Sequence, residues 1–346
     1  MLNQIHPNKI RQLFFLSVII LLFIVISKEL YSVLGAFLGA ITLYVLLRNL
    51  MIKLTVKFNM KKWLASIILI ISSLIIIIIP AIWIVSISYE KIQPIINNPT
   101  LLNQTFEKIH LYLIQKVNID ILNADNIAKI NAFVLGYAKK IVGGTMATLG
   151  NIFIMFFVLY FMLVQTLEIE TWLRKNVPFN NSNVNKIINE SRNLIVSNAI
   201  GVPIVAILQG LTGLIGYFIF GVQDFLFLGI LTTICSMIPV VGSMIIWVPI
   251  MLYQLSLGNT WQGIAIGLWG FLLIGSVDNI ARFVLQKKMA NVHPLITIFG
   301  VFIGINIFGF LGIIFGPILF SIFFLLVKIY IDEFGKSNYD EKLDSD

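Results

Sequence analysis

The sequence is poor in the residues that build redox, metal and hydrolytic sites. Its 346 residues include one cysteine, Cys235, so no internal disulfide and no cysteine-rich zinc site can form. The three histidines, His6, His110 and His293, stand too far apart for metal-ligand spacing. A glycine-rich loop ending in lysine, which would bind nucleotide phosphates, is also missing. We therefore expect a protein that is not an enzyme and that needs no metal or cofactor.

Charged residues are scarce as well. They make up 12% of the chain, whereas soluble domains carry roughly a quarter. Hydrophobic residues make up 58%, and the mean hydropathy is +0.95. So much apolar surface must be covered by lipid, which predicts an all-α polytopic membrane protein. The net charge of +8 lies in short loops beside apolar runs, so it indicates membrane topology and anionic lipid rather than nucleic acid.

Apolar runs long enough to span a membrane occur eight times, since a transmembrane helix needs about 20 such residues. The segments are 10–27, 30–47, 63–85, 145–167, 194–220, 225–254, 260–277 and 294–331. No small-residue cleavage motif follows the first run. We therefore predict that the first two runs form an uncleaved transmembrane hairpin.

The basic residues predict the orientation of the chain. The loop 48–62 contains five basic residues and no acid, which places it and the N-terminus in the cytoplasm. The segment 90–144 then lies outside, where apolar stripes of helical spacing predict two amphipathic helices. These stripes could contact the membrane surface, a sister subunit in a homo-oligomer or the protein's own spans.

The predicted organisation has five parts. They are residues 1–89 with transmembrane helices 1–3, the extracytoplasmic insertion 90–144, transmembrane helix 4 with a cytoplasmic connector at 145–193, a transport core at 194–331 and an acidic cytoplasmic tail at 332–346. Two runs of the core, 225–254 and 294–331, are too long for one simple span and contain glycine and proline. They predict either re-entrant hairpins with tips at Pro239–Gly242 and Gly316–Pro317, in an inverted repeat, or kinked spans.

The region 207–317 resembles the autoinducer-2 exporter (AI-2E) family of bacterial membrane proteins. The resemblance rests on Gln209-Gly210, Phe220-Gly221, Ile238-Pro239-Val240-Val241-Gly242, Pro249, Gly258, Asp278-Asn279, His293-Pro294-Leu295, Phe308-Gly309, Gly312 and Gly316-Pro317. The chain departs from the family at Phe283, where a proline is common, and at Ile303, where one of a glycine pair is common. The resemblance implies a transporter in the bacterial inner membrane and leaves open signal export or sodium/proton antiport.

Ionisable residues at membrane depth are the first candidates for function, because burying a charge in lipid is costly. Between Glu190 and Asp332 the only acids are Asp224 and Asp278. Asp278, with Asn279 and with Arg282 one helical turn later, is a candidate ion-coupling site or gate, or else a structural ion pair. Asp224 reads as a turn residue or helix cap.

Polar and helix-breaking residues form the second set of candidates. The predicted substrate path comprises Gln209, Thr233, Ser236, Pro239, Gly242, Asn306, Gly309, Gly312, Gly316 and Pro317. Such residues could bind a small polyhydroxylated solute or an ion. They could equally serve helix–helix hydrogen bonding and close packing in the membrane. We therefore expect a transporter, with a non-transporting oligomeric scaffold as the alternative of another class.

Overall fold

In the computed structural model the described residues form helices joined by short turns and contain no strand. It describes residues 7–98, 100–118, 120, 122–143, 145–176, 181–238, 241–277, 279–280, 294–308 and 312–331. The elements are α1 (Pro7–Ile52), η1 (Lys53–Lys57), α2 (Lys62–Asn97), α3 (Thr100–Val117), α4 (Ala124–Gly143), α5 (Thr145–Val164), α6 (Thr166–Asn176), α7 (Asn181–Val196), η2 (Ser197–Gly201), α8 (Val202–Ile219), α9 (Phe225–Cys235), α10 (Met244–Ser256), α11 (Thr260–Trp269), η3 (Gly270–Ile274), α13 (Pro294–Phe308) and α14 (Gly312–Tyr330).

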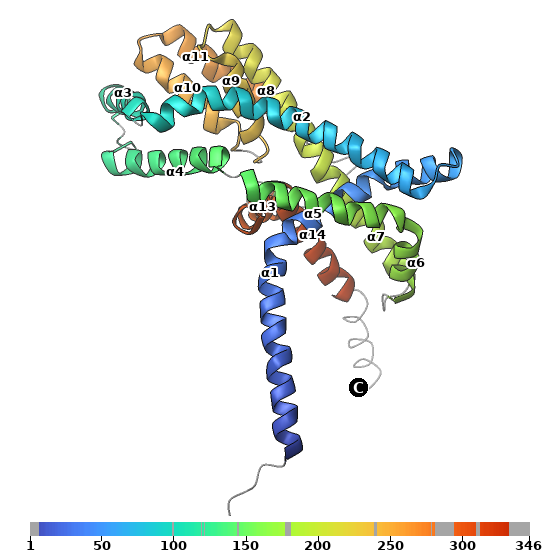
Figure 1. Ribbon diagram of the computed structural model, residues 1–346. Coiled ribbons are helices and arrows are strands. Elements are labelled where there is room, and N and C mark those ends of the chain that lie inside the picture. The colour runs from blue at the N-terminus through green and yellow to red at the C-terminus, as the bar shows by residue number, and fades with distance from the viewer. Residues whose placement is uncertain are drawn as a thin grey trace, which may run out of the picture.

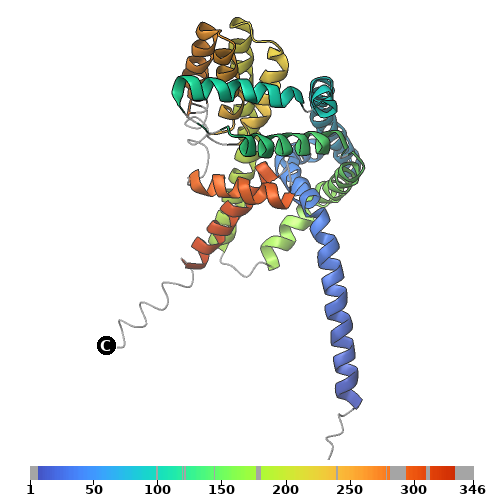
Figure 2. The same cartoon turned by 90° about the vertical axis from the view of Figure 1, so that its left-hand side faces the viewer.

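Five of these helices are long and apolar enough to cross a membrane, or six if the bent pair α5–α6 counts as one span. The predicted all-α polytopic membrane fold is therefore confirmed, whereas the predicted number of eight membrane segments is not. In Figures 1 and 2, helices α8 to α11 gather at one end of the molecule, and the N-terminal part of α1 projects from the other. Helices α13 and α14 lie between them.

The first two apolar runs form one helix, α1, and the predicted hairpin between them is wrong. The stretch Ser27 to Leu30 contains no glycine or proline, so nothing in it breaks the backbone hydrogen-bond ladder. The N-terminal part of α1 is exposed from Arg11 to Tyr31. Its C-terminal part packs along α5, and the two parts point in different directions (Figure 1).

The core of the N-terminal half lies where α1, α2 and α5 meet. Its centre is formed by Ala40, Ala65, Leu159 and Leu163, all of which are fully buried. Gly39 of α1 faces the side chain of Met155 on α5 at close range, so the two helices approach each other tightly. The small residues thus let three long helices come together without large side chains between them.

The segment between α2 and α5 forms the two expected amphipathic helices, α3 and α4. Ile109 on the predicted stripe of α3 is 2% exposed, whereas Leu111 and Ile114 lie outside the stripe and are exposed. Helix α3 packs against α10, and α4 packs against α2. These contacts favour packing onto the protein's own spans among the three alternatives. The side chains of Val117, Tyr137 and Ile141, which complete the predicted stripes, lie outside the described residues.

The run 225–254 is broken into α9 and α10, as its helix-breaking residues predict. The two helices contain 11 and 13 residues, which correspond to about 17 and 20 Å at 1.5 Å per residue. Neither could cross a hydrocarbon core of about 30 Å alone. Gly242 lies in the turn between them, next to the carbonyl groups of Cys235 and Ile238, and a Cβ at this position would overlap both oxygens.

The run 294–331 is also a pair, α13 and α14, which pack closely against each other. The predicted hairpin tip at Gly316–Pro317 is wrong, because both residues lie inside α14. The connection falls between Phe308 and Gly312. The glycine-proline pair lies in the second turn of α14, where the proline removes one backbone hydrogen bond and the helix continues.

Candidate transport site in the broken helices

Helices α8 and α9 bury a small set of polar side chains. Gln209 is 3% exposed, and its Nε2 donates to the carbonyl oxygen of Ile274 on η3 at 3.4 Å. The hydroxyl groups of Tyr217 and Thr232 lie 3.1 Å apart, and both residues are at most 1% exposed. Thr232 also donates to the carbonyl oxygen of Leu228 at 2.8 Å. These bonds connect α8 to α9 and η3 in the way that transmembrane helices commonly use polar groups.

One buried hydroxyl at the end of α9, that of Ser236, takes no part in these hydrogen bonds. Ser236 is 6% exposed, and its Oγ has no hydrogen-bond partner within the described residues. Thr233, one helical turn earlier, is half-buried and donates to the carbonyl oxygen of Gly229 at 3.1 Å. A buried hydroxyl without a partner costs free energy, so the Ser236 hydroxyl is available to a water, an ion or a solute. Four other buried side chains of the described residues also have an unpartnered polar atom, namely Ser88, His110, Asn131 and Ser321. Thr233 thus lies in the last turn of α9, Ser236 ends the helix, and Gly242 lies in the turn that follows.

Two tryptophan side chains pack directly against glycine backbone in the helices α8, α10 and α11 and in η3. A Cβ at Gly216 would lie 2.5 Å from the indole ring of Trp269, and Gly270 is covered in the same way by Trp247. The Nε1 of Trp269 donates to the carbonyl oxygen of Thr212 at 2.9 Å. Neither tryptophan was among the residues predicted from the sequence. The glycines of segments 210–216 and 263–270 could have indicated this packing, because glycine allows a large aromatic side chain to lie against the backbone.

Helices α13 and α14 meet backbone to backbone. Gly300 and Gly304 on α13 lie against Gly312 and Gly316 on α14, and a Cβ at Gly304 would lie 2.7 Å from the Cα of Gly316. The predicted path residues Gly312, Gly316 and Pro317 are all buried in this interface. Their geometry is therefore that of close helix packing, which was the structural alternative in the sequence analysis.

The remaining candidates divide into exposed residues and residues outside the described part of the chain. Asn306 on α13 is exposed and donates to the carbonyl oxygen of Phe302 at 3.1 Å. Asn279 is exposed as well. Asp278, Arg282, Pro239 and Gly309 lie outside the described residues. The structure therefore brings Gln209, Thr233, Ser236 and Gly242 to the α8–α10 region, and places the other buried candidates on the separate pair α13–α14 (Figure 1).

A cluster of charged residues ties α6 to the ends of α1 and α2. The guanidinium of Arg48 holds both carboxylate oxygens of Glu170, with 2.6 Å between Nη2 and Oε2. Tyr44 donates to the same carboxylate at 3.3 Å. The hydrogen bond from Arg48 holds the pKa of Glu170 below its ordinary value. Lys62 binds Glu168 at 2.9 Å.

A second ion pair lies at the other end of α2. The Nζ of Lys91 is 2.6 Å from Oδ1 of Asp224, and both side chains are about half exposed. Asp224 occupies the N-cap position of α9 with φ of 57°, but its side chain makes no capping hydrogen bond. Asp224 thus connects the α8–α9 turn to α2 through an ion pair, and its side chain does not cap the N-terminus of α9.

Membrane-length helices, paired broken helices and buried polar groups beside the breaks define a polytopic α-helical membrane protein of the transporter class. The chain belongs to the AI-2E transporter family, whose sequence signature matches residues 13–332. The resemblance found in residues 207–317 is thereby confirmed, and it extends over nearly the whole chain.

Similar proteins occur in several bacteria. A proposed transport protein of Aquifex aeolicus is 26% identical over 183 residues, which cover 53% of this chain and 52% of that protein. A proposed transport protein of Helicobacter pylori is 29% identical over 220 residues, which cover 60% of each chain. YdiK, a proposed transport protein of Escherichia coli, is 26% identical over 135 residues, or 39% of this chain and 36% of YdiK. The chain thus matches about half to three-fifths of the length of the first two relatives.

Proposed function

We propose that this protein moves a small polar solute across the bacterial inner membrane, with its N-terminus in the cytoplasm. The exported autoinducer-2 signal, a small polyhydroxylated molecule, is the substrate that the family membership suggests first. Ser236 offers a hydroxyl to such a solute at the helix break. Gln209 and Thr233, whose donors bond the carbonyl oxygens of Ile274 and Gly229, add polar groups on α8 and α9. The exposed apolar part of α1 offers a surface for lipid or a sister subunit, so the proposal includes a homo-oligomer.

The observation that carries this proposal is the unpartnered hydroxyl of Ser236. It lies where α9 ends and where the backbone no longer follows a helix. In a membrane, irregular backbone is tolerated only where protein or an aqueous cavity satisfies it. A transported solute that replaces water at this place would give Ser236 its missing partner.

A flux assay with matched serine variants tests the proposal. Inverted vesicles that contain the full chain should accumulate at least one solute from a panel of radiolabelled polyols and signalling furanoses. Ser236→Ala should reduce the initial rate about fivefold or more, because one hydrogen bond to the solute is lost. Ser256→Ala is the control, since the Ser256 hydroxyl already donates to the Tyr253 carbonyl at 2.8 Å. Equal rates for both variants, or no protein-dependent flux across the panel, would contradict the proposal.

The alternative is sodium/proton antiport, and the same helix end supports it. The C-terminal end of α9 carries the negative end of the helix dipole and free carbonyl groups, which suit a cation. Asp278 is the proposed coupling residue. Asp278→Asn should then assemble normally and lose gradient-dependent sodium flux. If the residue only pairs with Arg282, the single variant should be unstable, and adding Arg282→Gln should restore both stability and flux.

A further inference from the structure

The helix α6 leaves the end of the apolar helix α5 at a steep angle. The two helix axes differ by 80°, although backbone hydrogen bonds continue through the bend at Gln165. On α5, Phe153, Phe157 and Phe161 form an exposed row of aromatic side chains that leads to the bend. In a membrane protein such a row is suited to contact with lipid, and the bend turns α6 away from the axis of α5.

The two faces of α6 differ sharply in their contacts. The inner face is fixed by the bonds of Glu170 to Arg48 and Tyr44, and Arg174 donates to Asn185 on α7 at 2.7 Å. The outer face leaves large apolar side chains uncovered. Leu167 is 56% exposed and Trp172 is 63% exposed. The helix is therefore held firmly from one side while an amphipathic surface points away from the protein.

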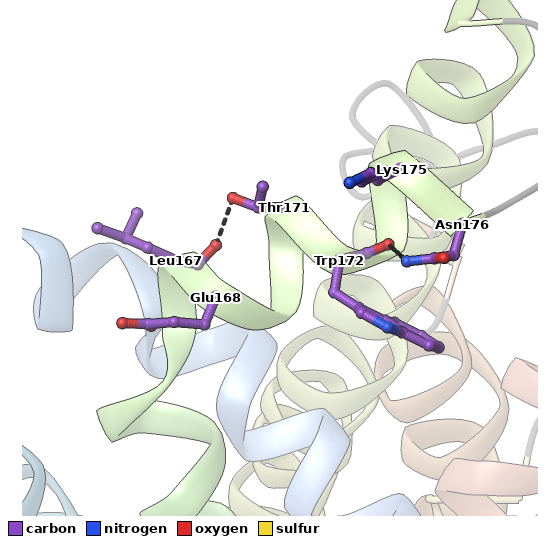
Figure 3. A pocket seen from close by; sticks show the side chains of 6 residues that line it. All are labelled: Leu167, Glu168, Thr171, Trp172, Lys175 and Asn176. Atoms are coloured by element: carbon purple, nitrogen blue, oxygen red, sulfur yellow. Dashed lines mark hydrogen bonds between the residues drawn. The ribbon is translucent and has the colours of Figure 1, made fainter.

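The outer face forms a shallow depression of about 570 Å³, which is lined by Leu167, Glu168, Thr171, Trp172, Lys175 and Asn176 (Figure 3). Three of its polar groups are occupied, since Thr171 donates to the Leu167 carbonyl, Asn176 donates to the Trp172 carbonyl and Glu168 binds Lys62. Lys175 is exposed and forms no ion pair with any described residue. An ammonium group and an indole ring are thus available together.

The surroundings of this surface are positively charged. The segments 48–62 and 166–176 contain seven basic residues and only two acids, Glu168 and Glu170. Both acids are paired with basic residues of the first segment. This leaves Lys53, Lys57, Lys61, Arg174 and Lys175 without an ion pair among the described residues, and of these Arg174 donates to Asn185. An anion is therefore the partner that matches this surface in charge, and the neighbouring bilayer presents anions as lipid phosphates.

We propose that α6 is an interfacial helix whose outer face binds the headgroup of an anionic phospholipid. Leu167 and Trp172 reach into the boundary between headgroups and acyl chains, where tryptophan is typically found in membrane proteins. Lys175 binds the phosphate, and the lysines around η1 attract it to the surface. The exposed phenylalanines of α5 and the exposed Leu167 and Trp172 of α6 favour lipid over a soluble protein partner.

A probe on this face can test the proposal without any transport measurement. The full-length protein with Cys235→Ala and Leu167→Cys is labelled with the fluorophore NBD and placed in phosphatidylcholine vesicles with one quarter phosphatidylglycerol. Small amounts of phosphatidylglycerol or phosphatidylcholine with a nitroxide near the top of the acyl chain are then added as quenchers. We expect blue-shifted emission and at least about twofold stronger quenching by the anionic lipid.

The test variant and its control replace two exposed lysines that have no ion pair among the described residues. Lys175→Gln should abolish the preference for phosphatidylglycerol, whereas Lys129→Gln on α4 should leave it unchanged. Equal quenching by the two lipids before mutation would overturn the anionic headgroup as the ligand. Water-like emission that neither lipid quenches would overturn membrane contact altogether, and would mean that water or another protein covers this face. An elution volume equal to that of the parent protein in size-exclusion chromatography verifies that each variant is folded.

Discussion

At the scale of single residues, two carboxylates on α6 that are two positions apart have different roles. The Glu170 side chain is about a quarter exposed and accepts bonds from Arg48 and Tyr44 on α1. The Glu168 side chain is 59% exposed and pairs with the ammonium group of Lys62 at 2.9 Å. A two-pronged guanidinium bond in a half-buried setting stabilises more than an exposed pair does.

Glu170→Gln should therefore destabilise the protein by about 1 kcal/mol at neutral pH, after allowance for screening by water. The Arg48 hydrogen bond lowers the pKa of Glu170 from its ordinary 4.5. Its stabilising effect is thus fully present above pH 4.5 and disappears as the pH falls through the lower folded-state pKa. Thermal unfolding in detergent, measured from pH 7 downward, should show the difference between variant and parent shrinking below about pH 4.5.

The control for this prediction is Glu168→Gln, which should change the melting temperature much less at every pH. A larger loss in Glu168→Gln than in Glu170→Gln would contradict the assignment of Glu170 as the residue that fixes α6. The sequence predicted that the basic loop and the connector lie on one side of the membrane. It could not predict which acid meets which base, because the pairing depends on the 80° bend of α6.

At the scale of elements, the glycines decide how closely helices approach. Gly316 touches Gly300 and Gly304 across the α13–α14 interface, whereas Gly150 on α5 has nothing within 4 Å of its missing Cβ. The two positions thus have the same residue and the same helical backbone but opposite surroundings. The added methyl group of alanine should have opposite consequences at the two sites.

Gly316→Ala should destabilise the protein by about 1–3 kcal/mol or prevent assembly, because the methyl group would overlap the backbone of α13. Gly150→Ala should instead be neutral or stabilising by up to about 1 kcal/mol, since alanine is the better helix former. Melting temperature and monodisperse yield measure both effects. A destabilised Gly150→Ala with an intact Gly316→Ala would invert the prediction and refute the backbone contact.

The spacing of apolar residues and the positions of glycine and proline predicted most of the helices, but they gave two wrong helix ends. The amphipathic spacing of α3 and the break in 225–254 follow from local sequence, so both predictions were confirmed. The hairpin before Leu30 was wrong because two charged residues in a row do not end a helix when no glycine or proline accompanies them. The tip at Gly316–Pro317 was wrong because glycine that breaks a helix and glycine that serves close packing have the same spacing.

At the scale of the whole molecule, two ion pairs mark the two ends of α2. Lys62 binds Glu168 near its beginning, and Lys91 binds Asp224 near its end. These lysines are 29 residues apart, or about 44 Å along a helix, which exceeds the hydrocarbon thickness of about 30 Å. If α2 spans the bilayer, the two pairs must lie on opposite sides of it.

Single cysteines in a Cys235→Ala background test this arrangement. Cysteines at positions 57 and 171 should react alike with an impermeant thiol reagent, because ion pairs hold their segments together. Cysteines at positions 90 and 223 should react alike as well, and from the opposite side. The positive-inside rule predicts that the first pair reacts only in inverted vesicles. Reaction of all four positions from one side would refute α2 as a span.

The candidate site was predictable only in part at this scale. Gln209, Thr233 and Ser236 were recognisable as polar residues in apolar segments, and the structure places them on α8 and at the end of α9. Their separation from the α13–α14 pair was not predictable, since it depends on which helices pack together. Helix pairing in lipid follows surface shape and small residues from distant segments, which a single segment does not reveal.

The backbone contact between α13 and α14 has a consequence for the order in which the protein assembles. In lipid the hydrophobic effect does not drive helices together, so association must come from close packing. This pair contains its own packing surface, with Gly300 and Gly304 on one helix and Gly312 and Gly316 on the next. The two helices are consecutive in the chain, so they leave the ribosome one directly after the other. They can therefore close into a hairpin on insertion and dock afterwards, as one finished piece, against α7 and η2.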